Sequence, residues 1–179
     1  MSLGDTLAPV LRRNGGSAVG FEPPTIRDGE RLWQLALDSR TLDVNSRYSY
    51  LLWCRDFAET SVVARHDGEA VGFITGYRRP GSPGTLFIWQ VAVADSHRRQ
   101  GLARRMLDNL AARLIPQGIT ALEATVTPDN LPSTRLFTSF AEARGAELTR
   151  DELFSGQLLG EGHLAEILFR IAPLSPASE

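Results

Sequence analysis

The sequence predicts an α/β fold with a mixed central sheet flanked by helices, and three observations support this. Two segments with helical spacing of apolar residues come first in the chain. Short β-prone runs separated by tight turns come next, and the remaining chain alternates helix, strand, helix and strand. An antiparallel meander joined to such an alternation is typical of a sheet with both parallel and antiparallel neighbours.

The N-terminal segment predicts a short strand and a first helix. Ordered structure should begin near residues 19–21, and Pro23 and Pro24 end that strand. Thr25 or Asp28 can cap the helix by accepting hydrogen bonds from its first N–H groups. The helix has an apolar stripe formed by Leu32, Trp33, Leu35 and Ala36.

A polar loop, residues 41–46, separates this helix from a second one. Asn45 or Ser46 is the expected N-cap. Cys54 lies among the apolar residues of the second helix, so we expect a buried thiol rather than an acyl-carrying nucleophile. Those apolar residues include Tyr48, Leu51, Leu52 and Phe57.

Three strands are expected in the middle of the chain. Asp67-Gly68 joins β-prone runs at residues 61–65 and 70–74, and this dipeptide between two such runs predicts a hairpin. A third strand follows at residues 85–93. The three runs form the antiparallel meander.

The C-terminal half predicts two helices and two strands. A helix begins near Gly101, and a strand follows at residues 119–126. Asp129 and Asn130 then precede a second helix, and the last apolar run, residues 165–171, is the final strand. The apolar residues of the second helix are Leu136, Phe137 and Phe140.

Composition limits the possible partners and compartments. The 19 basic and 21 acidic residues give a net charge of -2, which argues against a general nucleic-acid or anionic-membrane surface. A single cysteine cannot form an internal disulfide, and no signal peptide or membrane-spanning run is evident. We therefore expect a cytoplasmic protein with one domain at residues 19–173 and tails at residues 1–18 and 174–179.

The most specific motif lies where the third meander strand meets the next helix. Apolar residues 87–93 lead into a basic turn, residues 98–101, and a helix begins at Leu102. Such a turn directs backbone N–H groups and the positive end of a helix dipole to one point, and Gly101 lets the main chain approach a ligand closely. The motif predicts a pyrophosphate site. A dinucleotide-binding fingerprint would need a third glycine, which this turn lacks.

The pattern Arg98-x-x-Gly101-x-Ala103 after a strand resembles the coenzyme A loop of the GNAT superfamily of N-acetyltransferases. The resemblance implies acetyl-CoA as cosubstrate and no metal. It also implies that strands 86–93 and 120–126 splay apart around the pantetheine arm. The coenzyme-binding residues that it assigns are Val91, Ala92, Val93, Arg98, Arg99, Gln100, Gly101, Leu102, Ala103 and Asn130.

One segment departs from the superfamily pattern. Many GNAT enzymes carry Asn-x-x-Ala-x-x-Leu-Tyr after the fifth strand, with the tyrosine as general acid, whereas this chain has Asn130-x-x-Ser133-x-x-Leu136-Phe137. The proton for the departing thiolate would then come from Tyr48 or from water. Alternatively, none is needed, because a thiol pKa of about 8.5 makes the thiolate an acceptable leaving group.

Segments outside the coenzyme loop are similar to the diaminobutyrate acetyltransferase family of ectoine biosynthesis. The resemblance implies acetyl transfer to the side-chain N4 amine of L-2,4-diaminobutyrate, the precursor step to ectoine, a compatible solute against osmotic stress. A homodimer is also expected. The segments that carry the resemblance are residues 21–25, 41–46, 48–52, 58–61, 72–77, 87–93, 125–128 and 160–163, together with Glu166.

This reaction makes three chemical demands. An alkyl amine with a pKa near 10.4 is neutral in only about one molecule in 2,500 at pH 7, so the site must remove its proton. The thioester carbonyl must be polarised, which backbone N–H groups near residues 91–93 can do. The α-ammonium and α-carboxylate must be held so that only one nitrogen reacts. Carboxylate side chains suit the α-ammonium, and hydroxyls or an arginine suit the α-carboxylate.

The resemblance to this family and the chemical demands of the reaction together indicate the candidate residues. Glu123 is the expected proton relay and Tyr48 the expected donor to the thiolate, so these two are the predicted catalytic residues. Asp43 and Glu166 are expected to hold the charged α-amino end. The predicted substrate-binding residues are Asp43, Tyr48, Trp89, His163 and Glu166.

Each candidate also has a purely structural alternative. Asp43 could form an Asx-turn, Trp89 could belong to the core, and Tyr48 could be a half-buried helix residue. Glu123 and His163 could face solvent. At the level of function, the alternatives are a GNAT enzyme for a polyamine, an aminoglycoside or a protein N-terminus, a non-catalytic coenzyme A sensor, and an interaction domain. The polar residues gathered within residues 43–50 favour a small charged acceptor.

Overall fold

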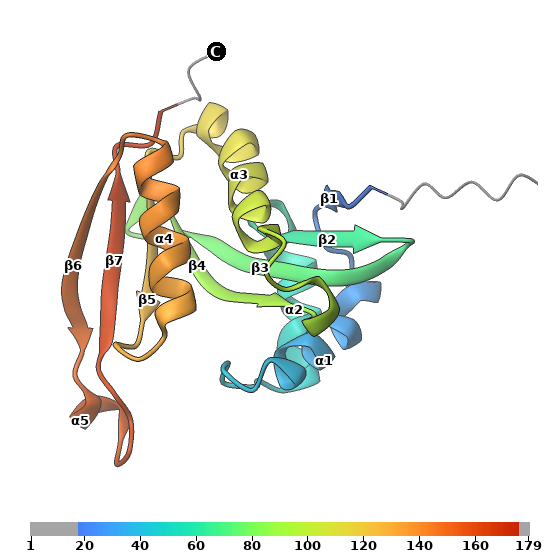
Figure 1. Ribbon diagram of the computed structural model, residues 1–179, viewed down its shortest axis with the longest axis horizontal. Helices are drawn as coiled ribbons and strands as arrows, with labels where there is room; N and C mark the ends of the chain where they lie inside the picture. The colour runs from blue at the N-terminus through green and yellow to red at the C-terminus, as the bar shows by residue number, and fades with distance from the viewer. Residues whose placement is uncertain (1–17, 176–179) are drawn as a thin grey trace, which may run out of the picture.

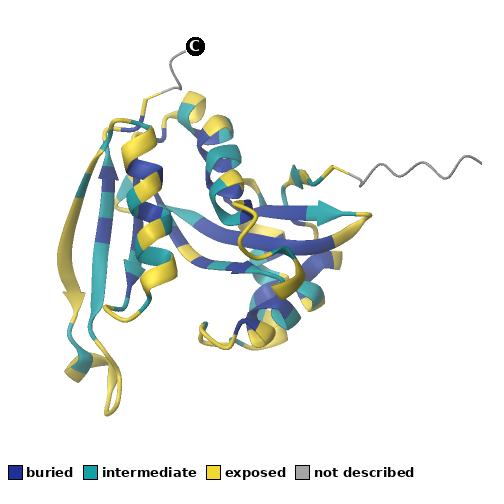
Figure 2. Ribbon diagram, viewed as in Figure 1, coloured by how far each residue is buried: buried dark blue, intermediate teal, exposed yellow. Residues whose placement is uncertain are grey.

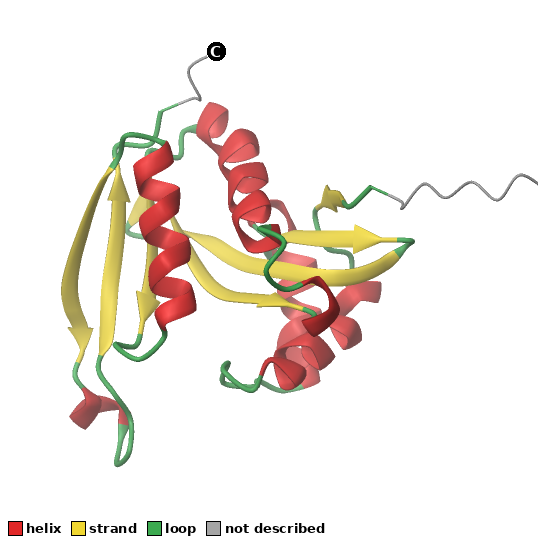
Figure 3. Cartoon of the chain, viewed as in Figure 1, coloured by secondary structure: helices red, strands yellow, loops and turns green. Residues whose placement is uncertain are grey.

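The computed structural model describes residues 18–175 and has a seven-stranded sheet at its centre. The sheet has the order β1-β2-β3-β4-β5-β7-β6, and helices cover both of its faces (Figures 1 and 3). Only β4 and β5 pair in parallel, and all other neighbours are antiparallel. The predicted mixed sheet is therefore confirmed. The strands are β1 Gly20–Glu22, β2 Val62–His66, β3 Glu69–Arg79, β4 Ser82–Val93, β5 Ala121–Val126, β6 Glu147–Phe154 and β7 Glu166–Ala172.

Two helices begin at caps whose side chains bond to the first turn, whereas Asp28 precedes α1 without a side-chain cap hydrogen bond. Ser46 precedes α2, and its side chain accepts a hydrogen bond of 3.3 Å from the Ser49 N–H. Asn130 does the same for α4, with 3.1 Å to the Ser133 N–H. The helices are α1 Gly29–Ser39, α2 Arg47–Asp56, α3 Leu102–Leu114, α4 Leu131–Ala143 and α5 Gly156–Leu159, with a 3-10 turn at Ile26–Asp28 before α1 and another at Asp95–His97 before α3.

The hairpin between β2 and β3 forms at the predicted dipeptide. Asp67 and Gly68 have φ values of 51° and 84°, so both lie in the left-handed region that a type I′ turn requires. His66 at the end of β2 also bonds to His97 in the segment before α3, with 2.9 Å between Nδ1 and Nε2. The hairpin thus supports the segment that leads to the predicted coenzyme loop.

One strand, β6, was not predicted from the sequence. Its residues are almost all exposed, and charged and hydroxyl side chains alternate with few apolar ones. It lies at the edge of the sheet and pairs only with β7. An exposed edge strand has little apolar periodicity, which explains why sequence analysis missed it. Together with β7 it extends past the rest of the sheet, with α5 at the tip of the hairpin (Figure 1).

Two hydrophobic clusters fill the two faces of the sheet (Figure 2). The larger one joins α3 and α4 to the sheet, and the smaller one joins α1 and α2 to β2, β3 and β4. Leu174, which the sequence assigned to a tail, is buried in the larger cluster, and its N–H donates to the Thr120 carbonyl at 2.7 Å. The ordered domain therefore includes Leu174. Predicted tail residues 1–17 and 176–179 lie outside the described residues.

The parallel pair at the centre of the sheet separates halfway along its length. β4 and β5 pair from Thr85↔Ala121 to Ile88↔Ala124, and β4 then continues to Val93 without a partner on that edge. The two strands diverge in the lower part of Figure 1. The predicted splay is confirmed, and it begins after Ile88.

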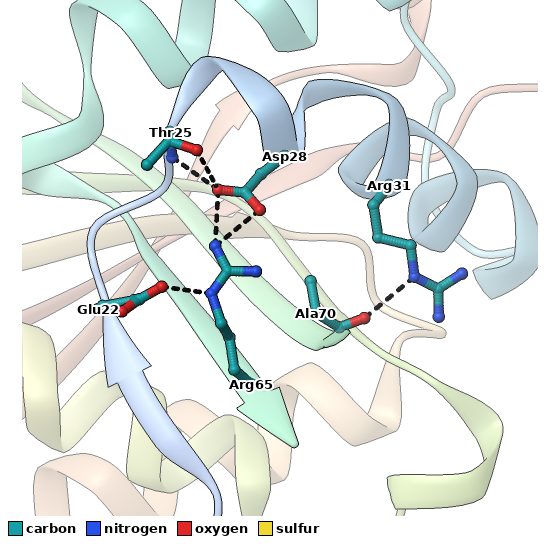
Figure 4. Close-up of polar contacts among 6 residues, drawn as sticks. All are labelled: Glu22, Thr25, Asp28, Arg31, Arg65 and Ala70. Carbon is teal, nitrogen blue, oxygen red and sulfur yellow. Dashed lines mark hydrogen bonds and ion pairs between the residues drawn. The ribbon is translucent and has the colours of Figure 1, made fainter. Parts of the chain in front are cut away.

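A buried carboxylate anchors the N-terminal segment to β2. Asp28 is only 6% exposed, and both of its oxygens accept hydrogen bonds from Arg65, at 2.7 and 2.9 Å (Figure 4). The same guanidinium also pairs with Glu22, and the Thr25 N–H donates to Asp28 at 2.7 Å. These bonds fix where α1 starts, and therefore the position of the helix beside β4.

We expect Asp28→Ala to destabilise the protein by about 3 kcal/mol, because removing one member of a buried ion pair leaves the other uncompensated. Urea unfolding measures the change. Asp56→Ala is the matched control: Asp56 also pairs with an arginine, Arg55 at 2.7 Å, but that pair is exposed and should contribute little. Equal effects of the two substitutions would contradict the anchoring role of Asp28.

Candidate active site

The candidate active site is built around a bulge in β4. Thr75 pairs with Gln90 and Gly76 with Ile88, so Trp89 is an extra residue without a partner in β3. A Cβ on Gly76 would come within 2.9 Å of the Phe87 carbonyl oxygen, so only glycine fits opposite the bulge. Because a bulge interrupts the alternation of a strand, both Trp89 and Gln90 can face α2.

Both bulge residues contact α2. Trp89 stacks on Trp53 with 4.2 Å between ring centroids and remains 38% exposed. Gln90 is buried, and its Oε1 accepts a hydrogen bond of 3.0 Å from the Tyr50 hydroxyl. Trp89 is thus a partly open aromatic wall beside the splay, the location expected for a substrate contact.

Gln90 also holds the loop between α1 and α2. Its Nε2 donates to the Asp43 backbone carbonyl at 2.9 Å. Burial raises the pKa of Tyr50, so the hydroxyl stays protonated and donates to Gln90 at neutral pH. The chain of bonds from Tyr50 through Gln90 to Asp43 places the loop next to the bulge and leaves the Asp43 side chain exposed. Neither Gln90 nor Tyr50 was singled out from the sequence, although a glutamine inside an apolar strand is a usable signal.

The predicted coenzyme loop has the expected backbone. Gly101 is the N-cap of α3 and has a φ of 69°, and a Cβ there would have no neighbour within 4 Å. Arg99 also has a positive φ, 59°. Arg98 donates through Nε to the Val93 carbonyl at 3.2 Å and pairs with Asp95 at 3.0 Å. The loop therefore leaves open space in front of the positive end of α3, as a pyrophosphate site requires.

Asn130 lies across the splay from this loop, at the start of α4 after β5. Its Oδ1 caps α4 by accepting from Ser133, so the amide group is already positioned. The predicted coenzyme residues thus border the unpaired part of β4 on one side and the end of β5 on the other. Contact of these residues with the coenzyme stays a prediction.

Glu166 lies at the same end of the splay. It is the first residue of β7. It lies just beyond the last pair between β5 and β7, which joins Val126 to Ile167. Ile167, Phe169 and Ile171 pack toward α4, so Glu166 belongs to the alternate set that faces the side of α1 and α2. The strands therefore place Glu166 on the sheet face on which Gln90 holds Asp43.

His163 lies farther out, in the loop between α5 and β7, and is exposed. Its N–H donates to the Gly160 carbonyl at 3.3 Å, within the same loop. Among the described residues, no hydrogen bond connects His163 to the loop that contains Asp43. A substrate contact for His163 stays a prediction.

Tyr48 lies on the exposed side of α2. It is 67% exposed, whereas Tyr50 on the same helix is 2% exposed and reaches β4. Residues two positions apart on a helix differ in direction by about 200°. Tyr48 therefore projects from a different side of α2 than Tyr50, and its predicted contacts with the substrate and the thiolate stay predictions.

Glu123 is buried between two arginines. Its oxygens accept from Arg79 at 2.9 Å and from Arg170 at 2.7 Å, and its side chain is 4% exposed. It also lies within the paired part of β4 and β5, opposite Phe87. Both oxygens are occupied, so the predicted proton relay through Glu123 does not fit, and neither does the solvent-facing alternative. The carboxylate instead ties β3, β5 and β7 together.

Cys54 is a buried thiol, as expected. It is 3% exposed within the smaller core cluster, and burial raises the pKa of the thiol to about 12. A thiol with so high a pKa carries almost no thiolate at neutral pH. Within residues 18–175, no group of three or more potential metal ligands comes together, and no helix is long and apolar enough to cross a membrane.

Comparisons with known proteins show the family of this chain. The profile of the acetyltransferase (GNAT) family matches residues 29–141. The chain therefore belongs to the GNAT family of acetyltransferases. It is 57% identical to the L-2,4-diaminobutyric acid acetyltransferase of Streptomyces coelicolor over 158 residues, 87% of this chain and 93% of that protein. It is 42% identical to the enzyme of the same name from Marinococcus halophilus over 159 residues, 88% of this chain and 92% of that protein.

Solved structures of acetyltransferases are also similar to this chain. The diaminobutyrate acetyltransferase EctA from Paenibacillus lautus, in complex with its substrate L-2,4-diaminobutyric acid and coenzyme A, superposes with a TM-score of 0.85 at 41% identity, covering 92% of this chain and 100% of that chain. An N-acetyltransferase from Staphylococcus aureus superposes with a TM-score of 0.70 at 17% identity, covering 89% and 100%, which shows the shared fold alone.

We expect Gly101→Val to weaken acetyl-CoA binding by at least about tenfold, because a branched side chain would occupy the space in front of α3 and strain a backbone with positive φ. Titration calorimetry with coenzyme A measures the change. Gly118→Val is the matched control, since Gly118 also has a positive φ, 93°, and open surroundings, but lies at the other end of α3. Unchanged affinity in folded Gly101→Val would remove the coenzyme from this loop.

Proposed function

We propose that the protein transfers the acetyl group of acetyl-CoA to the N4 amine of L-2,4-diaminobutyrate. The main observation in support is that three features meet where β4 and β5 separate. They are a coenzyme loop of the GNAT type, the aromatic wall at Trp89, and the carboxylates of Asp43 and Glu166 on the same sheet face. Two carboxylates beside a thioester site suit a small acceptor with an ammonium group. Relatives that share up to 57% of the aligned residues carry the name of this activity.

The proposed reaction is a direct attack in a ternary complex. The neutral N4 amine forms a bond to the thioester carbonyl carbon, the C–S bond breaks, and the amine proton passes to water at the site. Backbone N–H groups on the unpaired edge of residues 89–93 stabilise the oxyanion. Phe137 occupies the position of the usual tyrosine, and the thiolate leaves without an obligatory acid because a thiol pKa of about 8.5 makes it an acceptable leaving group.

Asp43 and Glu166 have a positioning role in this proposal. They attract the α-ammonium from the two sides of the splay, so that the N4 amine extends toward the coenzyme. His163 and Trp89 complete the acceptor site, and Asn130 contacts the pantetheine arm. We further propose a cytoplasmic homodimer whose product is used for ectoine synthesis under osmotic stress. A second candidate function, coenzyme A sensing without catalysis, would be supported only by binding of acetyl-CoA without thiol release.

Cys54→Ala should keep turnover within a few-fold of the parent, because a thiol with a pKa of about 12 cannot serve as the acyl carrier. Steady-state thiol release measures turnover. Mass spectrometry of the parent mixed with acetyl-CoA alone should show no added acetyl group. A stable acetyl adduct on Cys54 would replace the ternary-complex mechanism with a ping-pong mechanism.

Diaminobutyrate should be a better substrate than ornithine or lysine, whose longer arms carry the amine past the carbonyl, and a misplacement of ~1 Å can cost about a hundredfold in rate. Butane-1,4-diamine, which lacks the carboxylate, should be poor. A thiol-release assay over this panel, with identification of the acetylated nitrogen, tests the proposal. Equal kcat/KM for diaminobutyrate and lysine, or acetylation mainly at the α-nitrogen, would overturn it.

The same assay tests the two carboxylates. Asp43→Asn and Glu166→Gln keep the shape and remove the charge, so each should raise KM for diaminobutyrate by about tenfold or more while the affinity for acetyl-CoA stays the same. Glu147→Gln is the matched control, because Glu147 is an exposed carboxylate at the other end of the β6–β7 hairpin. A similar KM in all three variants would exclude both residues from the acceptor site.

A further inference from the structure

The turn at residues 58–61 leads into β2 and contains none of the predicted site residues. It begins as a 3-10 turn, Ala58–Thr60. Thr60 and Ser61, at its end, are only 8% and 0% exposed. Two consecutive buried hydroxyls need hydrogen-bond partners, so the partners show what this turn supports.

Both hydroxyls bond to the backbone of Gly76 in β3. The ladder between β2 and β3 ends at Val62↔Ile74, and its continuation would place Thr60 opposite Gly76. Instead, the Thr60 hydroxyl donates to the Gly76 carbonyl at 2.6 Å, and the Ser61 hydroxyl accepts from the Gly76 N–H at 3.3 Å. These two hydroxyls, the hydroxyl clamp, replace the backbone partner that β2 no longer supplies.

Gly76 is also the residue of β3 at which the bulge of β4 occurs. It pairs with Ile88, whereas the residue before it pairs with Gln90. The position of Gly76 therefore sets where Trp89 bulges from β4. A Cβ on Gly76 would come within 3.0 Å of the Thr60 carbonyl oxygen, so the turn packs directly on this glycine.

The turn is held in place from α3. Arg113, in the last turn of this helix, donates to the Ser61 carbonyl at 2.6 Å and to the Glu59 carbonyl at 3.3 Å. Its Nε donates to the Asn109 side chain at 3.2 Å, which fixes the guanidinium on its own helix. The hydroxyl clamp is therefore supported by a rigid element, as a positioning role requires.

We propose that Thr60 and Ser61 are positioning residues for the acceptor: they hold Gly76, and Gly76 fixes the bulge that presents Trp89 and Gln90 to α2. Thr60 makes the shorter bond and has the larger effect. A buried carbonyl that loses its donor has to find another, so the backbone at Gly76 moves and the aromatic wall at Trp89 moves with it. The inference rests on the proposed function, because the acceptor is the ligand whose position is at stake.

Thr60→Val tests the hydroxyl clamp, because valine keeps the branched shape and removes the hydroxyl. The variant should lower kcat/KM for diaminobutyrate by about tenfold or more, mainly through KM, because transfer is sensitive to misplacement of ~1 Å. Its affinity for coenzyme A, measured by titration calorimetry, should change by less than about threefold, because the coenzyme loop lies beyond the end of β4. Thr60→Ser retains the hydroxyl and should restore the KM of the parent.

A second readout does not depend on the acceptor. The rings of Trp53 and Trp89 are stacked with 4.2 Å between centroids, and stacked indoles give an exciton couplet in the circular dichroism spectrum. The couplet should weaken in Thr60→Val and return in Thr60→Ser. If the parent did not acetylate diaminobutyrate, the proposed function would fail, and the couplet alone would decide whether the hydroxyl clamp positions Trp89.

Thr85→Val is the matched control. Thr85 is 2% exposed and its hydroxyl lies 3.0 Å from that of Ser82, but it belongs to the part of β4 that is paired with β5. This variant should lose stability in urea unfolding and keep both the KM for diaminobutyrate and the couplet of the parent.

Three results would overturn the inference. The first is a folded Thr60→Val variant with the KM and the couplet of the parent. The second is an equal change in Thr85→Val, which would assign the effect to general loss of stability. The third is failure of Thr60→Ser to restore the parent, which would assign it to packing of the methyl group. If Thr60→Val does not fold, Ser61→Ala removes the longer bond and is judged by the same KM and couplet.

Discussion

The separation of β4 from β5 after Ile88 is the constraint on which the rest of the site depends. Backbone N–H and carbonyl groups in a sheet need partners, and the edge of β4 from residue 89 to residue 93 has no partner strand. A pantetheine arm can supply those partners as a strand would. The bulge at Trp89 lies at the beginning of this open edge, so the change in strand direction and the reacting groups occur at the same place.

Two sets of contacts keep the splay open in a defined shape. Glu123 ties β3, β5 and β7 together within the paired part of β4 and β5, before the splay begins, through Arg79 and Arg170. Gln90 links β4 to α2 and to the Asp43 loop on the acceptor side. Breaking either set would alter the distance between the coenzyme edge and the carboxylates, and a transfer reaction is sensitive to that distance. Stability and chemistry therefore depend on the same residues.

Much of the fold could be predicted from local patterns, because the caps at Ser46 and Asn130, the Asp67-Gly68 turn and the coenzyme loop are set by neighbouring residues. β6 could not, since an exposed edge strand has no apolar stripe. The relay role expected of Glu123 does not fit the structure for a tertiary reason, because sequence position does not reveal that two distant arginines pair with its carboxylate. The roles expected of Tyr48 stay predictions. Gln90 was missed because its partners lie 40 and 47 residues away.

The most direct test of this account is a crystal structure of the protein with coenzyme A and L-2,4-diaminobutyrate. We expect pantetheine amides hydrogen-bonded to the open edge of residues 89–93, and an acceptor whose α-ammonium lies between Asp43 and Glu166 with its N4 amine directed at the sulfur. A pantetheine arm elsewhere, or an acceptor on the sheet face covered by α3 and α4, would contradict it.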